Sequence, residues 1–131
     1  MQLNAEPILY EYAIVRYTPV VEREEFVNIG LIMMCKRRRW IKTAMHIDEE
    51  RIKALFPGAD IDMLRQQLES FSLVASGKGG TIGELETHER FRWLTAVRSA
   101  CIGTSRPHPG LCHDLEATFD SIFKECVLTT C

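Results

Sequence analysis

Three segments in the first part of the chain carry apolar side chains with the spacing of β-strands. Residues 8–17 are rich in β-branched and aromatic side chains, and residues 40–47 alternate between apolar and polar positions. Residues 26–35 are apolar on both faces, which is typical of a strand in the middle of a sheet. Because the connections between the three segments are short, the sequence predicts an antiparallel meander.

After residue 47 the apolar spacing changes to that of helices. Asp48, Asp60 and Asp114 each precede a helical segment as an expected N-terminal cap. The helix after Asp60 has one apolar stripe that can lie on the sheet, formed by Ile61, Leu64, Leu68 and Phe71. This order of elements predicts an α+β fold, in which an antiparallel sheet of three to four strands has helices packed on one face. We expect a single domain over residues 8–128, with loose termini at residues 1–7 and 129–131.

Composition restricts the class of partner. The 131 residues include 16 basic and 18 acidic side chains, and the resulting net charge of −2 gives no overall field that would attract nucleic acid or an anionic membrane. The five cysteines are odd in number and show no CxxC spacing, which favours a reducing compartment. The longest apolar run, residues 29–35, is too short to span a bilayer. We therefore expect a cytoplasmic protein, and any anion site must be local.

The segment from Thr87 to Ser105 concentrates arginines and hydroxyl groups among residues that should be buried. It is expected to form a short helix through Leu94, a turn at Arg98 and Ser99, and a strand that ends at Ser105. Guanidinium groups offer paired donors that match phosphate or carboxylate, and hydroxyl groups can complete such a site. The alternative is that these arginines form only surface pairs with neighbouring glutamates, such as Glu89 with Arg92.

Two residues of the predicted strands extend this candidate site. Arg16 shares a strand face with two tyrosines, so its guanidinium could reach the site across the sheet. Strict alternation places Asn28 on the same face as Ile32 and Met34, where a polar amide needs partners, while Gly30 leaves room for another group to approach. The predicted ligand-binding residues are Arg16, Asn28, Arg92, Arg98, Ser99, Thr104 and Ser105.

Other clusters give weaker signals. The glycine-rich residues 76–83 lack the ending of a phosphate-binding loop and favour a linker or flexible lid. Residues 108–114 contain histidine, cysteine and aspartate without the spacing of a zinc site, so we expect no metal and no cofactor. The basic turn at residues 36–39, followed by Trp40, is the candidate for contact with nucleic acid, although four residues favour a solubilising hairpin tip.

Several separated motifs resemble one bacterial family. They are Tyr12-Ala-Ile-Val-Arg-Tyr, Glu24-Glu-Phe-Val-Asn-Ile-Gly, Glu89-Arg-Phe-Arg-Trp-Leu, Arg98-Ser and Thr104-Ser. In this order they look like the family called domain of unknown function 3037, over nearly the whole chain. The resemblance implies a small cytoplasmic bacterial protein, often encoded near a HipA-like kinase, and it carries over no activity and no site residues.

Three functions remain open from the sequence. The first is a non-enzymatic binding module with an arginine-lined pocket for a phosphate-containing ligand or nucleotide. The second is an enzyme that acts on a phosphorylated or nucleic-acid substrate, with Glu25 or Glu89 as general base. The third is a partner subunit, of a HipA-like kinase or toxin-antitoxin type system or of a second copy of this chain, that docks through a strand edge or Trp40. Neither a membrane nor nucleic acid is expected as the partner.

Overall fold

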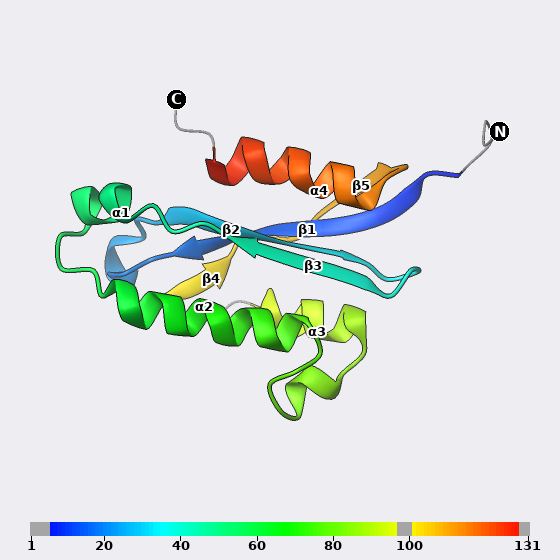
Figure 1. Cartoon of the computed structure of the whole chain (residues 1–131), viewed down its shortest axis with the longest axis horizontal. Coiled ribbons are helices and arrows are strands. Elements are labelled where there is room, and N and C mark those ends of the chain that lie inside the picture. Colours follow the sequence, from blue (N-terminus) through cyan, green and yellow to red (C-terminus); the bar gives the residue numbers. More distant parts are fainter. Residues whose placement is uncertain (1–5, 97–100, 129–131) are drawn as a thin grey trace.

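In the computed structural model, the described residues are 6–96 and 101–128. They form one five-stranded antiparallel sheet with helices on both sides (Figure 1). The strands are β1 (Ile8–Tyr17), β2 (Val27–Cys35), β3 (Trp40–Met45), β4 (Ile102–Thr104) and β5 (His108–Cys112). The α-helices are α1 (Glu49–Leu55), α2 (Ile61–Ala75), α3 (Thr87–Leu94) and α4 (Leu115–Phe123), and a π-helix (Lys124–Leu128) continues α4. The predicted α+β class is confirmed.

The three predicted caps form as expected. The side chains of Asp48, Asp60 and Asp114 accept hydrogen bonds from main-chain N–H groups at the start of α1, α2 and α4, at 3.1, 3.0 and 3.0 Å. Each bond satisfies a donor that the first turn of a helix leaves unpaired. Local sequence therefore fixes where these helices begin.

The strand order is β3-β2-β1-β4, and β5 also pairs with β1. The predicted meander of the first three strands is confirmed by the antiparallel pairing of β1 with β2 and of β2 with β3. The fifth strand differs from the prediction, which gave the sheet three to four strands. β5 runs along the first half of β1, opposite Ile8–Tyr12, whereas β4 runs along the second half, opposite Val15–Tyr17. An edge position allows Pro109 and Gly110 to lie in a strand.

Helices cover both faces of the sheet, and this also differs from the expected arrangement on one face. Side chains of α1, α2 and α3 pack on one face with Val15, Ile29 and Ile32, whereas α4 and the π-helix pack on the other with Leu31 and Met33. Figure 1 shows α4 above the sheet and α2 and α3 below it. Both faces of β2 are apolar, so a layer of helices is needed on each side to keep these side chains away from water.

A bulge in β2 changes the face on which Asn28 lies. Val15 pairs with Gly30 but the next residue, Arg16, pairs with Asn28, so Ile29 is an extra residue on β2. The predicted strict alternation is therefore wrong at this position. Asn28 lies on the face covered by α4 and the π-helix, together with Arg16, while Ile32 remains on the opposite face.

Candidate functional site

The predicted ligand-binding residues fall into separate groups. Arg98 and Ser99 lie outside the described residues. Arg92 belongs to α3, on the face of the sheet covered by α1, α2 and α3. Arg16 and Asn28 lie on the face covered by α4. The strand end with Thr104 and Ser105 pairs with the second half of β1.

Arg92 already has a carboxylate partner. Its two terminal nitrogens donate to Oε1 and Oε2 of Glu11 at 2.8 and 2.6 Å. This bidentate geometry is the one that a guanidinium forms with a bound carboxylate or phosphate. The hydrogen bonds to Glu11 raise the pKa of Arg92 above its ordinary value. Glu11 therefore occupies the donors that the anion-site prediction assigned to a ligand.

Arg90 has a structural role that the surface-pair alternative did not include. Its Nε donates to the carbonyl of Ala75 at 3.2 Å and its Nη1 to the carbonyl of Leu85 at 2.6 Å. One side chain thus joins the end of α2 to the segment that precedes α3. Because both acceptors are main-chain carbonyls that the helix ladders leave unpaired, Arg90 holds the two ends of the glycine-rich connection together.

Ser105 is buried and completes the pairing of β1. Its Oγ accepts a hydrogen bond from the N–H of Ile14 at 2.9 Å and donates to the carbonyl of Arg106 at 3.1 Å, while its own N–H donates to the carbonyl of Ile14 at 2.8 Å. Thr104, which pairs with Val15, has a buried Oγ1 that bonds to none of the described residues. The hydroxyl of Ser105 therefore serves the sheet, whereas that of Thr104 retains capacity for one more bond.

Arg16 and Asn28 form the pair that the structure does bring together. They are cross-strand neighbours on one face, and the Arg16 guanidinium lies 4.1 Å from the centre of the Phe26 ring. Nδ2 of Asn28 donates to the carbonyl of Cys126 in the π-helix at 3.3 Å. Nε of Arg16 and Oδ1 of Asn28 are both shielded from solvent and have no hydrogen-bond partner in the described part of the chain. A buried donor and a buried acceptor in adjacent positions are costly unless a further group satisfies them.

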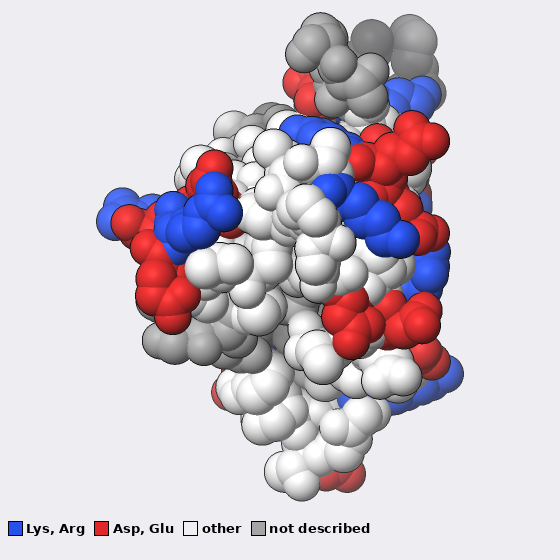
Figure 2. Space-filling model, turned by 90° about the vertical axis from the view of Figure 1, so that its left-hand side faces the viewer, with Lys and Arg blue, Asp and Glu red and all other residues white. Residues whose placement is uncertain are grey.

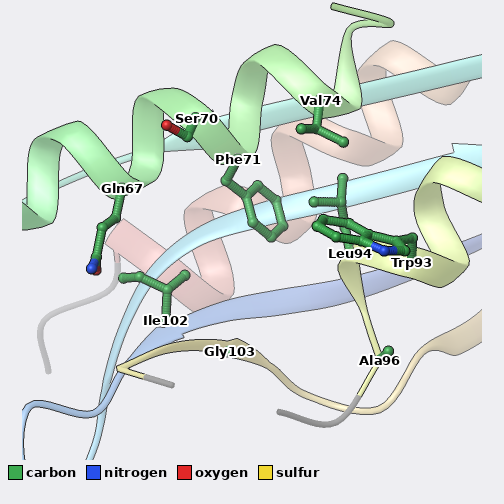
Figure 3. Close-up of a pocket in the computed structure, with 9 residues that line it drawn as sticks. All are labelled: Gln67, Ser70, Phe71, Val74, Trp93, Leu94, Ala96, Ile102 and Gly103. Atoms are coloured by element: carbon green, nitrogen blue, oxygen red, sulfur yellow. The ribbon is translucent and has the colours of Figure 1, made fainter. Parts of the chain in front are cut away.

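A cavity of about 280 Å³ lies between α2, the end of α3 and β4. Figure 3 shows the rings of Phe71 and Trp93 and the side chains of Val74 and Ile102 around it, with Gln67 and Ser70 as its polar members. Ala96 and β4 also border the cavity. Its described lining is mainly apolar and contains no arginine, while Arg98 and Ser99 of the predicted anion pocket lie outside the described residues.

The glutamates proposed as general bases have other partners. Glu89 accepts a hydrogen bond from the N–H of Glu86 at 3.3 Å, within the capping box of α3. Glu25 forms an ion pair with Arg23, and both side chains are exposed. Among the described residues, no three histidine, cysteine, aspartate or glutamate side chains are grouped so that they could hold a metal ion.

The described cysteines are free thiols: Cys35 is buried, and Cys101, Cys112 and Cys126 are half-buried. Burial raises the pKa of the Cys126 thiol above its ordinary value, and the negative charge of Glu125 raises it further. A raised pKa reduces the thiolate that would act as a nucleophile. The described cysteines thus act as small core residues.

Trp40, proposed from the sequence as a docking residue, is half-buried. Its ring contacts Phe119 edge to face at 6.5 Å between centroids, and its Nε1 donates to Glu116 at 3.2 Å. The sequence interpretation did not single out Leu9 and Leu111, which are paired across β1 and β5 and are 62% and 64% exposed. Only the pairing of the two strands, which are far apart in the chain, places these leucines side by side.

No described helix is both long enough and apolar enough to cross a membrane. The model of the family described as "Protein of unknown function (DUF3037)" matches residues 12–127. Comparison with curated proteins and with solved structures gives no match.

Proposed function

The chain belongs to the DUF3037 family of proteins of unknown function, and from that premise we propose that it is a non-enzymatic binding module with an anion site centred on Arg16. The observation that carries the proposal is that two cross-strand neighbours each hold a buried atom without a partner among the described residues, Nε of Arg16 and Oδ1 of Asn28. A guanidinium without a carboxylate partner in the described part of the chain has donors left for a ligand.

The chemistry of the pair favours a phosphate group. Arg16 supplies the positive charge and the donors, whereas Oδ1 of Asn28 needs a donor. A singly protonated phosphate offers both, because its anionic oxygens accept hydrogen bonds and its hydroxyl donates one. The ring of Phe26, which is 44% exposed, holds the guanidinium from one side. The sequence predicted this ligand class around Arg98, and the proposal places its centre at Arg16.

Binding without catalysis is supported by the groups around the pair. Cys126 touches Asn28 through its main-chain carbonyl, and the raised pKa of its thiol makes it a poor nucleophile at neutral pH. Glu25 is paired with Arg23 and Glu89 caps α3, and within the described residues neither forms an ion pair with Arg16.

Titration of inorganic phosphate and AMP by calorimetry and by NMR tests this proposal. The wild type is expected to bind, with shifts in the amides of residues 14–17 and 27–29. Arg16→Gln is expected to weaken binding by about tenfold or more, because a charge-assisted contact is lost. Arg51→Gln, which removes an exposed arginine from α1, is the matched control and should bind as the wild type does.

Thermal unfolding of each variant separates lost binding from lost structure. A folded Arg16→Gln protein that binds both ligands as tightly as the wild type would rule out the site, as would a wild type that binds neither. A parallel titration of Arg98→Ala tests the other predicted part of the site, which lies outside the described residues.

A further inference from the structure

A second surface, at the opposite end of β1 from Arg16, carries unpaired positive charge. An open groove of about 590 Å³ lies between the start of β1, the β2–β3 turn and the start of α3. We call it the basic groove, and its lining includes Leu9, Lys36, Arg37, Arg39, Glu86 and His88. Figure 1 shows these three segments at the same end of the molecule.

The cations of this turn are free of carboxylates. Lys36, Arg37 and Arg39 are exposed, and within the described residues their side chains form neither an ion pair nor a hydrogen bond. The other end of the sheet differs, because there Arg65 is paired with Glu49 at 2.8 Å and Arg23 with Glu25. Figure 2, which faces that other end, shows basic side chains next to acidic ones. The basic groove thus brings together three cations that form no ion pair with another described residue.

An apolar row crosses the sheet beside these charges. Leu9 lines the groove and is paired with Leu111 of β5, and both leucines are more than half exposed, at 62% and 64%. The β1–β2 pairing ends at Glu11 and Met34, and Leu9 and Lys36, each two residues beyond that pair, both line the groove. The two leucines of β1 and β5 therefore lie beside the cations of the turn. Exposed apolar side chains next to charge are typical of a surface that contacts a protein.

The backbone of the turn adds a separate observation. Arg39 has a φ of 50°, in the left-handed region that favours glycine or asparagine. Its N–H donates to the carbonyl of Lys36 at 3.2 Å, which closes the turn. Glycine would suit this position better for folding alone. An arginine here therefore points to a use for the side chain.

We propose that the basic groove binds an extended acidic segment of a partner protein, with its carboxylates at Lys36, Arg37 and Arg39 and its apolar side chains on Leu9 and Leu111. This proposal is independent of the anion site at Arg16. An acidic peptide fits better than nucleic acid because bases stack on aromatic rings, and among the described lining residues only His88 has such a ring. Leu9 instead offers an aliphatic side chain. Glu86 also lines the groove, where its Oε2 lies 3.9 Å from Nδ1 of His88. It supplies one carboxylate against three cations.

The test uses fluorescence anisotropy with a labelled peptide of alternating glutamates and leucines. Three comparison ligands are a peptide with lysine in place of glutamate, a peptide of glutamates alone, and a single-stranded oligonucleotide of equal charge. The wild type should bind the glutamate–leucine peptide most tightly, and the affinity should fall as salt is added. Amide shifts at Leu9, Leu111 and His88 should accompany binding.

Arg39→Gly is the decisive variant because it relieves the left-handed backbone while it removes the charge. It should be at least as stable as the wild type and bind the peptide about fivefold or more weakly. Glu24, which also has a positive φ of 55°, provides the matched control. Glu24→Gly gives the same backbone relief away from the groove and should leave binding unchanged.

A second variant, Lys36→Gln, tests the charge without any change of backbone preference. The proposal is overturned if the peptide does not bind, if neither Arg39→Gly nor Lys36→Gln weakens binding, or if the oligonucleotide binds as tightly as the peptide. The last outcome would assign the basic groove to nucleic acid.

Discussion

Ser105 shows how one side chain can replace a main-chain group. Its Oγ takes the N–H of Ile14 at 2.9 Å, at the point where β1 changes its partner from β5 to β4. Without this hydroxyl the N–H of Ile14 would lose its acceptor inside the sheet. An orphaned buried donor costs more than an average hydrogen bond contributes.

Ser105→Ala is therefore expected to destabilise the protein by about 1–3 kcal/mol. Chemical denaturation measures this change, and hydrogen exchange at Ile14 should become faster than in the wild type. Ser121→Ala, at an exposed position of α4, serves as the control and should change stability little. Equal stability of the two variants would contradict the role assigned to Ser105.

The arginines illustrate how a residue's surroundings decide its role. Arg90 binds main-chain carbonyls, Arg92 binds Glu11, and Arg16 lies over Phe26. A sequence gives the same guanidinium in all three cases. Only the groups within reach of each one separate a structural role from a candidate binding role.

At the scale of elements, β2 owes its shape to a bulge next to Gly30. A Cβ at Gly30 would overlap the Met45 side chain of β3 and lie 2.8 Å from the carbonyl oxygen of Ala44. Close approach of the neighbouring strand thus requires glycine here, as the sequence suggested. The bulge also turns Asn28 toward the π-helix, where its Nδ2 bonds to Cys126.

Gly30→Ala is expected to destabilise the fold by about 1–3 kcal/mol, because β3 must shift away from β2. Gly103→Ala is the matched strand control, since a Cβ at Gly103 meets nothing within 4 Å. Thermal unfolding compares the two. If Gly103→Ala were the more destabilising change, the close contact at Gly30 would not be the constraint we describe.

On the scale of the whole molecule, the sheet separates two hydrophobic cores. Phe91 and Leu64 belong to the core under α2 and α3, and Phe119 and Leu31 to the core under α4. The contacts of Glu116 join α4 to the edge strand β3: its Oε1 accepts from Nζ of Lys42 at 2.6 Å and its Oε2 from Nε1 of Trp40 at 3.2 Å. These bonds link the second core to the sheet edge.

The hydrogen bonds of Glu116 to Lys42 and Trp40 should depend on pH. The hydrogen bond from Lys42, and then that from Trp40, lowers the pKa of Glu116 below its ordinary value. A lowered pKa means that the contribution to stability is present above the unfolded-state pKa and is lost as the pH falls through the folded-state pKa. The indole N–H resonance of Trp40 should report this titration in NMR spectra. Lys42→Met should move its midpoint upward, and an unchanged midpoint would contradict the assignment.

The sequence alone determined the local features of this protein. β1 spans the predicted residues, β2 and β3 end within two residues of the predicted bounds, and the three aspartate caps form as expected. Strand alternation and capping act between residues close in the chain, so they can be read from it directly. The motifs that resemble DUF3037 likewise indicated the family, whose model matches residues 12–127.

Tertiary structure decided what depends on residues distant in the chain. The partner of Arg92 is Glu11, 81 residues away, and the partner of Leu9 is Leu111 in an edge strand beyond the three to four that were predicted. The bulge that brings Asn28 beside Arg16 cannot be recognised from the alternation of side chains along the strand. Local preferences do not distinguish between these arrangements, whereas pairing and packing between strands do. Both proposed binding surfaces therefore depend on the tertiary structure.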